Sequence, residues 1–194
     1  MTGRRVSAIV LAGGRSSRFG RDKLTEPIDG RTLLGHAIDA VRPFATEIIV
    51  VVAPDPTEVP ALPADVTVVH DTLAFEGPLA GFLAGLGAAR EPIALVVGGD
   101  MPSLVGAVLE AMLAESDAHG AVILEQDGRP RPLPMVVRRE PALATADHLI
   151  GAGERRLRAL ASALAAHVLP ESTWRVMDPG GLTLRDVDTP ADLV

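Results

Sequence analysis

The sequence is short of cysteine and of aromatic residues. It contains no cysteine and no tyrosine, and aromatic residues make up only 3% of its 194 positions. The absence of cysteine excludes disulfides, thiolate metal sites and cysteine nucleophiles. A chain of this kind fits a reducing compartment, so we expect a cytoplasmic protein.

Long apolar segments are also absent. No run of about 18 uninterrupted apolar residues occurs, so the sequence predicts no membrane span. The basic N-terminus is followed by an apolar run that is broken at Gly13 and Gly14, and this run is too short for a secretory signal peptide. We therefore expect no membrane as a partner.

Positively charged residues are also few. The chain has 18 Lys and Arg against 25 Asp and Glu, and Lys23 is its single lysine. The resulting net charge of -7 argues against a general nucleic-acid binder, which needs a basic face to neutralise phosphates. Any site for an anion must therefore be local.

Apolar residues, by contrast, are plentiful and occur in a regular pattern. At 47% hydrophobic, the chain is long enough for one domain with a sizeable core. Short runs rich in Val, Ile and Leu are typical of strands buried on both faces, and they alternate with helical patterns. The predicted strands are 6–11, 47–53, 66–70 and 93–99, and the predicted helices are 32–44, 77–90 and 104–116. We expect a single-domain, three-layer, Rossmann-like α/β fold with a mostly parallel sheet.

The second half of the chain is less regular. It predicts strands at 120–126 and 132–139, helices at 140–150 and 154–167, and a short edge strand at 174–178. The proline-rich segment 53–65 reads as a loop, because the alternation of strand and helix continues across it. We therefore treat 1–194 as one domain.

Glycine and cations gather in one segment, "VLAGGRSSRFGRDK" at 10–23. It follows the first predicted strand, and in open α/β sheets ligands bind beyond the carboxyl ends of the strands. Its glycines let backbone N–H groups approach phosphate oxygens, and Arg15, Arg18 and Lys23 can add charge. The spacing fits neither a P-loop nor the dinucleotide fingerprint. The alternative is a surface loop with solvated arginines.

This segment resembles the signature L-A-G-G-x-x-x-R-M-G-x-D-K of nucleotidyltransferases, in particular of the MobA-like molybdenum cofactor guanylyltransferases. Four further stretches follow in the same order and extend the resemblance over nearly the whole chain. They are "HDTLAFEGPLAG" at 70–81, "GGDMP" at 98–102, "GERRLRAL" at 153–160 and "DVDTPADL" at 186–193.

The resemblance implies a nucleotidyltransferase fold with a nucleotide-binding half, about 1–101, and an acceptor-binding half, about 102–194. It implies that the first loop wraps a triphosphate and that Lys23, Arg18 and Asp100 are the catalytic residues. The nucleotide-binding residues that it implies are Leu11, Ala12, Gly13, Gly14, Arg15, Lys23, Asp71, Gly77 and Gly81. For Asp71, an ordinary turn before Thr72 is an equal alternative.

Asp100 also points to a metal site without the resemblance. It follows a predicted strand and precedes Pro102, so its carboxylate should project from the same edge of the sheet as the first loop. A carboxylate beside bound phosphates is a typical ligand for Mg²⁺, and Mn²⁺ is an alternative ion. An aspartate at this position can instead simply cap a turn or a helix.

Asp188 is a candidate second metal ligand. Asp186 and Asp188 alternate on what reads as a short strand, so they should point to opposite faces. Asp188 can alternatively cap the final helix. Members of the guanylyl family often have asparagine at both positions, whereas aspartate is found in related cytidylyltransferases.

Arginines 155, 156 and 158 stand where a helix is predicted to begin. Cations oppose the helix dipole at that end, so an anion such as an acceptor phosphate would neutralise them. Solvated arginines around an amphipathic helix are the alternative.

The function implied by the resemblance is transfer of GMP from GTP to the terminal phosphate of molybdenum-molybdopterin, with release of pyrophosphate. The "LAGG" at 11–14 favours GTP, and "DVDTP" at 186–190 favours a molybdopterin cytidylyltransferase. Another small-molecule guanylyltransferase is a further alternative, and a nucleotide-binding regulator or cofactor carrier is the non-enzymatic one. Transient contact with cofactor-assembly proteins or apo-molybdoenzymes is a further implied partnership.

Overall fold

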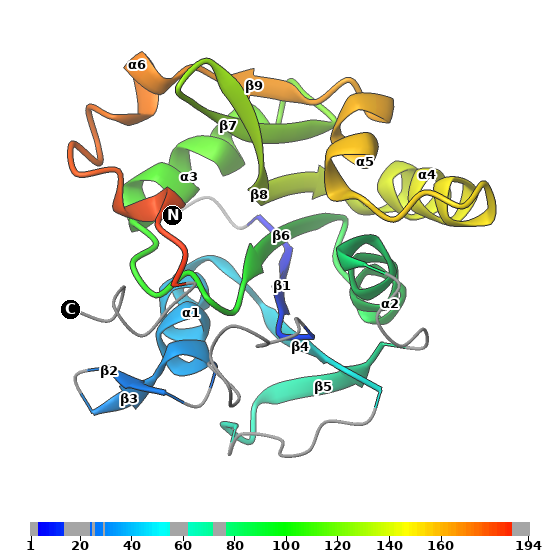
Figure 1. Cartoon of the computed structure of the whole chain (residues 1–194), viewed down its shortest axis with the longest axis horizontal. Coiled ribbons are helices and arrows are strands. Elements are labelled where there is room, and N and C mark those ends of the chain that lie inside the picture. Colours follow the sequence, from blue (N-terminus) through cyan, green and yellow to red (C-terminus); the bar gives the residue numbers. More distant parts are fainter. Residues whose placement is uncertain are drawn as a thin grey trace.

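A seven-stranded sheet forms the centre of the molecule (Figure 1), which is known from a computed structural model. The structure describes residues 4–13, 24, 26–28, 30–54, 62–71 and 77–187. The strands are β1 (Val6–Leu11), β4 (Glu47–Val52), β5 (Val66–His70), β6 (Ile93–Gly98), β7 (Ala121–Gln126), β8 (Arg129–Arg138) and β9 (His167–Leu169). They lie in the order β5-β4-β1-β6-β8-β7-β9. A separate pair, β2 (Pro27–Ile28) and β3 (Arg31–Thr32), precedes the first helix.

Most of the sheet is parallel, as the sequence predicted. β5, β4, β1 and β6 run in the same direction. β8 is antiparallel to both of its neighbours, β6 and β7, and β9 is parallel to β7. Because β8 lies between them, β7 runs in the same direction as β6, and the amino ends of these two strands lie at the same edge of the sheet.

Helices cover both faces of the sheet (Figure 1). On one face lie α1 (Leu33–Val41) and α3 (Gly106–Glu115), and on the other lie α2 (Pro78–Ala88), α4 (Arg139–Gly151) and α5 (Leu157–Ala163). Strand β1 shows why both faces must be covered. Val6, Ala8 and Val10 belong to the core under α1 and α3, whereas Ile9 belongs to the core under α2, α4 and α5. Burial on both faces explains its mostly apolar sequence, and its one polar residue, Ser7, donates to Glu47 at 2.6 Å.

The predicted strands and helices of the first half are confirmed, with boundaries shifted by a few residues. No described helix is both long and apolar enough to cross a membrane. Strand β8 begins at Arg129, earlier than the predicted start at 132. Asp127 and Gly128, with φ of 51° and 69°, make the two-residue turn that joins it to β7. An Asp-Gly pair is a typical hairpin turn, because both of its residues can adopt positive φ.

Two predictions for the second half are wrong. The segment 174–178 is not an edge strand, and β9 is the edge strand instead. Trp174 ends helix α6 (Glu171–Trp174), where it is fully buried and donates from Nε1 to the carbonyl of Glu125 at 2.8 Å. The apolar residues therefore anchor a helical turn and not a strand. Residues 185–187 form no strand either, so the predicted alternation of Asp186 and Asp188 does not apply, and Asp188 lies outside the described residues.

Candidate functional site

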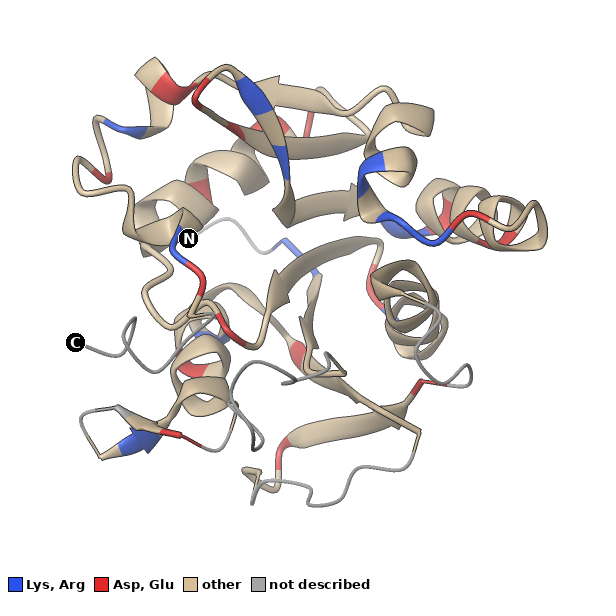
Figure 2. Cartoon of the chain, in the orientation of Figure 1, with Lys and Arg blue, Asp and Glu red and all other residues tan. Residues whose placement is uncertain are grey.

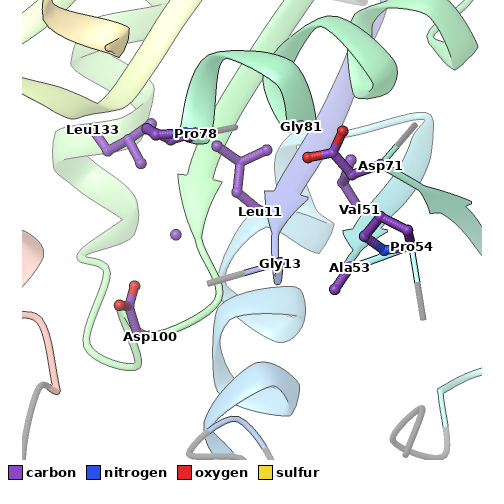
Figure 3. A pocket seen from close by; sticks show the side chains of 12 residues that line it. Leu11, Gly13, Val51, Ala53, Pro54, Asp71, Pro78, Gly81, Asp100 and Leu133 are labelled. Atoms are coloured by element: carbon purple, nitrogen blue, oxygen red, sulfur yellow. The ribbon is translucent and has the colours of Figure 1, made fainter. Parts of the chain in front are cut away.

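A cavity of about 500 Å³ lies at the carboxyl ends of β1, β4 and β6 (Figure 3). In this sheet β4 and β6 lie on opposite sides of β1, and a ligand site is expected where the order of strands reverses in this way. The lining residues are Leu11, Gly13, Val51, Ala53, Pro54, Asp71, Gly77, Pro78, Gly81, Gly98, Asp100 and Leu133.

Most of the described residues that the sequence predicted for nucleotide binding, catalysis or metal binding line this cavity. These are Leu11, Gly13, Asp71, Gly77, Gly81 and Asp100. Ala12 is placed differently, since its N–H donates to the carbonyl of Val51 at 2.7 Å and its side chain packs against the core under α1. The remaining predicted residues lie outside the described part of the chain. They are Gly14, Arg15, Arg18, Lys23 and Asp188.

Asp100 is held by a tight turn at the end of β6. The N–H of Met101 donates to the carbonyl of Gly98 at 3.3 Å, and the N–H of Gly98 lies 3.3 Å from the sulfur of Met101. The carbonyl of Asp100 accepts from the N–H of Val187 at 3.0 Å, which brings the C-terminal segment to this turn. The Asp100 carboxylate is half-buried and faces the cavity (Figure 3).

Asp71 occupies the opposite side of the cavity. Its N–H donates to the carbonyl of Val52 at 2.9 Å, which continues the hydrogen bonding of β4 and β5 by one residue. A Cβ atom on Gly81 would lie 3.5 Å from its Oδ2 atom, so the carboxylate rests against the first turns of α2. Leu11 lies between Asp71 and Asp100 (Figure 3). The cavity thus has an apolar floor between two carboxylates.

The turn before α2 is packed closely against the second half of the chain. Gly77 has a φ of 99°, and a Cβ atom there would lie 2.8 Å from the carbonyl oxygen of Arg155. The same carbonyl accepts from the N–H of Leu79 at 3.2 Å. Glycine is therefore required at position 77 both by the backbone conformation and by this contact.

A second hollow, a groove of about 830 Å³, adjoins the cavity and shares Pro78 and Leu133 with it. Its walls carry four arginines, Arg129 and Arg131 from β8 and Arg156 and Arg158 from the start of α5. The cations of β8 and of the segment before α5 are visible in Figure 2. We refer to this hollow as the arginine groove. It is a local concentration of positive charge on an acidic protein.

Two of the four arginines are paired with carboxylates. Arg156 donates to Glu154 from Nε at 2.9 Å and from Nη2 at 2.8 Å, and Arg131 lies 3.3 Å from Asp186. The Arg156 guanidinium, together with the N–H groups of residues 155 and 156, lowers the pKa of Glu154 to about 2. In the described part of the chain, the guanidinium groups of Arg129 and Arg158 have no such pairing. These two can bind an anion without first breaking an ion pair.

The predicted helix at 154–167 is shorter in the structure, where α5 begins at Leu157. Arg155 and Arg156 therefore precede the helix, and only Arg158 lies in its first turn. Arg155 donates to the carbonyls of Ile150 at 3.1 Å and Glu154 at 2.9 Å, which is a structural role. The argument from the helix dipole is thus limited to Arg158.

The sequence analysis missed the contributions of β8. Leu133 lines the cavity, and Arg129 and Arg131 line the groove. The alternating "RPRP" at 129–132 was a usable signal, because residues two apart on a strand share a face. Its location beside the cavity was not predictable, because no local pattern indicates that this strand inserts between β6 and β7.

Comparison with known proteins assigns the chain to a family. A family model described as the MobA-like NTP transferase domain matches residues 8–168. The chain belongs to this family. It is accordingly a nucleotidyltransferase, and the predicted enzyme class and α/β fold are confirmed.

Curated relatives cover most of the chain. A probable molybdenum cofactor guanylyltransferase of Chloroflexus aggregans is 36% identical over 194 residues, which are 97% of this chain and 91% of that protein. One of the same description from Mycobacterium bovis is 38% identical over 166 residues, covering 81% of this chain and 80% of that protein.

Solved structures share the fold. Molybdopterin-guanine dinucleotide biosynthesis protein A of Archaeoglobus fulgidus superimposes with a TM-score of 0.77 at 23% identity, covering 96% of this chain and 94% of that one. For 2-C-methyl-D-erythritol 4-phosphate cytidylyltransferase of Thermus thermophilus the TM-score is 0.71 at 18% identity, covering 95% and 94%. At these identities the likeness concerns the fold alone.

Proposed function

We propose that the protein transfers GMP from GTP to the terminal phosphate of molybdenum-molybdopterin and releases pyrophosphate. The descriptions of the curated relatives support this substrate pair. The structural observation that carries the proposal is that the cavity and the arginine groove are continuous. The cavity that contains Asp100 adjoins the arginine groove at Pro78 and Leu133.

In this proposal GTP occupies the cavity and the phosphate of the acceptor enters the arginine groove. A terminal phosphate oxygen of the acceptor forms a bond to the α-phosphorus of GTP, and the bond from that phosphorus to the β-phosphate bridging oxygen breaks. Arg129 and Arg158 hold the acceptor phosphate for an in-line approach. The protein contributes chiefly positioning and charge stabilisation, as is typical of transfer at phosphorus.

The first loop supplies the remaining positive charge. Arg15, Arg18 and Lys23 are the proposed contacts to the triphosphate and to the charge that develops during transfer. This assignment rests on the sequence signature, because the three residues lie outside the described part of the structure.

Magnesium is the proposed cofactor, and the described residues fit it. Asp100 offers a hard oxygen donor that faces the cavity, whereas Asp71 lies beyond Leu11 on the opposite side and is a proposed nucleotide contact. The Asp100 carboxylate and the phosphates carry charge of the same sign, so a cation between them would lower their repulsion. Mg²⁺ would neutralise charge on the phosphates, and Mn²⁺ accepts the same oxygen donors. Asp188 is the proposed second ligand on sequence grounds.

CTP is the second candidate nucleotide. A Cβ atom at Gly13 would meet the backbone N of Ala53 at 3.5 Å, an ordinary contact. Packing among the described residues therefore permits alanine at position 13, which is common in the cytidylyltransferases. The space around Gly13 therefore does not select guanine over cytosine.

The test has two parts. Calorimetry with GTP, CTP, ATP and UTP in the presence of Mg²⁺ measures the nucleotide preference, and pyrophosphate release is then assayed with molybdenum-molybdopterin. We expect GTP to be preferred, whereas preference for CTP would replace GMP transfer by CMP transfer. Asp100→Asn should lower pyrophosphate release by about 10²–10³-fold.

The matched control is Asp147→Asn, which removes a carboxylate from an exposed position on α4. Its activity should equal that of the native chain. Near-native activity of the Asp100 variant would overturn the metal assignment, and no binding of any triphosphate would overturn the proposed use of the cavity.

A further inference from the structure

Three potential metal ligands meet at the edge of the sheet that lies opposite the nucleotide cavity. Glu115 is the last residue of α3, His119 follows four residues later just before β7, and His167 is the first residue of β9. His167 pairs with Val122 near the amino end of β7, whereas Asp100 follows the carboxyl end of β6. The cluster is therefore separate from the transfer site.

The three side chains lie close together. The imidazole rings of His119 and His167 are stacked, with centroids 4.0 Å apart and planes inclined by 5°. Both Nε2 atoms face one carboxylate oxygen, since Oε2 of Glu115 lies 3.7 Å from His119 and 3.9 Å from His167. One ligand atom from each residue can be chosen so that all three lie within 4.8 Å of one another.

The backbone holds the ligands in place. The N–H of His119 donates to the carbonyl of Glu115 at 3.1 Å, so these two ligands belong to one continuous turn. The turn leads directly into β7, which carries β9 as its parallel partner. Strand β7 thus positions His167, through its pairing with β9, as well as Glu115 and His119, through the turn that precedes it.

We propose that Glu115, His119 and His167 bind one divalent transition-metal ion, of the Zn²⁺ class, which joins the end of α3 to the edge strand β9. Two imidazole nitrogens and one carboxylate oxygen are a ligand set that suits Zn²⁺. Bonds of about 2.0–2.2 Å in a tetrahedral site place neighbouring ligand atoms about 3.3 Å apart. The observed Oε2–Nε2 separations of 3.7 and 3.9 Å are close to this value, and the two stacked rings must tilt out of their parallel arrangement so that both Nε2 lone pairs point at the ion.

Exposure and donor chemistry define the site further. The three side chains are 33% to 42% exposed, so an ion can enter from solvent and water can complete its coordination. Nitrogen donors disfavour Mg²⁺, which prefers an octahedron of oxygen ligands. The site should therefore discriminate against the ion proposed for the transfer reaction.

The experiment titrates ZnCl₂ into the full chain after treatment with a chelator, using calorimetry in the presence of excess Mg²⁺. We expect one bound Zn²⁺ per chain and an increase in Tm on binding, because the ligands converge only in the folded state. His119→Ala and His167→Ala should each weaken binding by at least about tenfold. Glu115→Gln, which preserves side-chain size, should weaken it in the same direction.

Two controls separate this site from others. His148→Ala removes an exposed histidine on α4 and should leave Zn²⁺ binding unchanged, as should Asp100→Asn in the transfer site. Circular dichroism shows whether each variant is folded. No uptake at millimolar ZnCl₂, or equal uptake by the native chain and by folded variants of both histidines and Glu115, would overturn the proposal. Loss of binding in Asp100→Asn alone would locate the ion in the transfer site and overturn it as well.

Discussion

A Cβ atom on Gly98 would lie 2.5 Å from Oδ1 of Asp100. No unstrained structure contains so short a contact, so the position of the carboxylate depends on the missing side chain two residues earlier. Gly98 also pairs with Leu11 across β6 and β1, which keeps the strand end level with the floor of the cavity. The glycine at the end of the strand thus has a positioning role.

Gly98→Ala should therefore reduce nucleotidyl transfer by moving the Asp100 carboxylate. We expect a loss of about 100-fold in kcat/KM, the effect typical of a displaced catalytic group. The control is Gly120→Ala, because a Cβ atom at Gly120 meets nothing within 4 Å. If the Gly98 variant is folded and fully active, Asp100 does not need the position seen in the structure.

Arg129→Ala and Arg158→Ala should each raise the KM for the acceptor and leave the KM for the nucleotide unchanged. The loss of one charge-assisted contact corresponds to about 1.5–3 kcal/mol, or roughly 10- to 100-fold. Arg90→Ala removes an exposed arginine that lies just after α2, outside the arginine groove, and serves as the control. Equal effects on both substrates would place the two arginines outside the acceptor site.

The pairing of Glu154 predicts a pH dependence of stability. Its pKa is about 2 in the folded chain against 4.5 for an ordinary glutamate. A lowered pKa means that the folded state favours the carboxylate, so this stabilisation is complete above about pH 4.5 and is lost as the pH falls to about 2. The urea midpoint of Glu154→Gln should lie below that of the native chain near neutrality, and the two should converge in acid.

Glu110→Gln, an exposed carboxylate on α3, is the reference for removing one negative charge. A constant difference between native chain and Glu154→Gln over the whole range would contradict the ion pair with Arg156.

Asp178 should be important for stability and not for chemistry. It is 2% exposed, and its carboxylate accepts from the N–H groups of Leu182 at 3.0 Å and Thr183 at 2.8 Å. Asp178→Ala leaves these donors without their acceptor, and we expect a loss of about 3 kcal/mol in the free energy of unfolding. Urea unfolding followed by the fluorescence of Trp174, the single tryptophan, measures it.

Asp178→Asn retains one acceptor oxygen and should lose less stability than the alanine variant. Equal stability of the native chain and Asp178→Ala would show that other groups satisfy the two backbone donors.

Sequence reasoning was most successful where one physical signal dominated. Strands such as β1 and β6 are buried on both faces, so their nearly continuous apolar runs were sufficient to predict them. The same reasoning failed for 174–178, because the burial of Trp174 comes from a helical turn that follows Pro170. A short apolar segment does not distinguish between these two structures.

The residues of the candidate site also divide into those that the sequence could predict and those that it could not. Asp71 and Asp100 were predictable because Asp71 directly follows β5 and Asp100 follows β6 after one glycine, both in the parallel part of the sheet. Leu133 and Arg129 were not, because they come from β8, whose antiparallel insertion depends on pairing between distant segments. The role of Gly98 was not predictable either, since it depends on the exact turn that carries Asp100.

The insertion of β8 also separates the two ends of this strand. Residues Met135 to Arg138 pair with β6, from Val96 back to Ile93, while the other end, at Arg129, belongs to the hairpin with β7. Residues at the hairpin end can therefore change without disturbing the strand ends that hold Leu11 and Asp100. Under the proposed function, substitutions along this one ribbon would alter the contacts to the acceptor and leave the strand ends of the cavity in place.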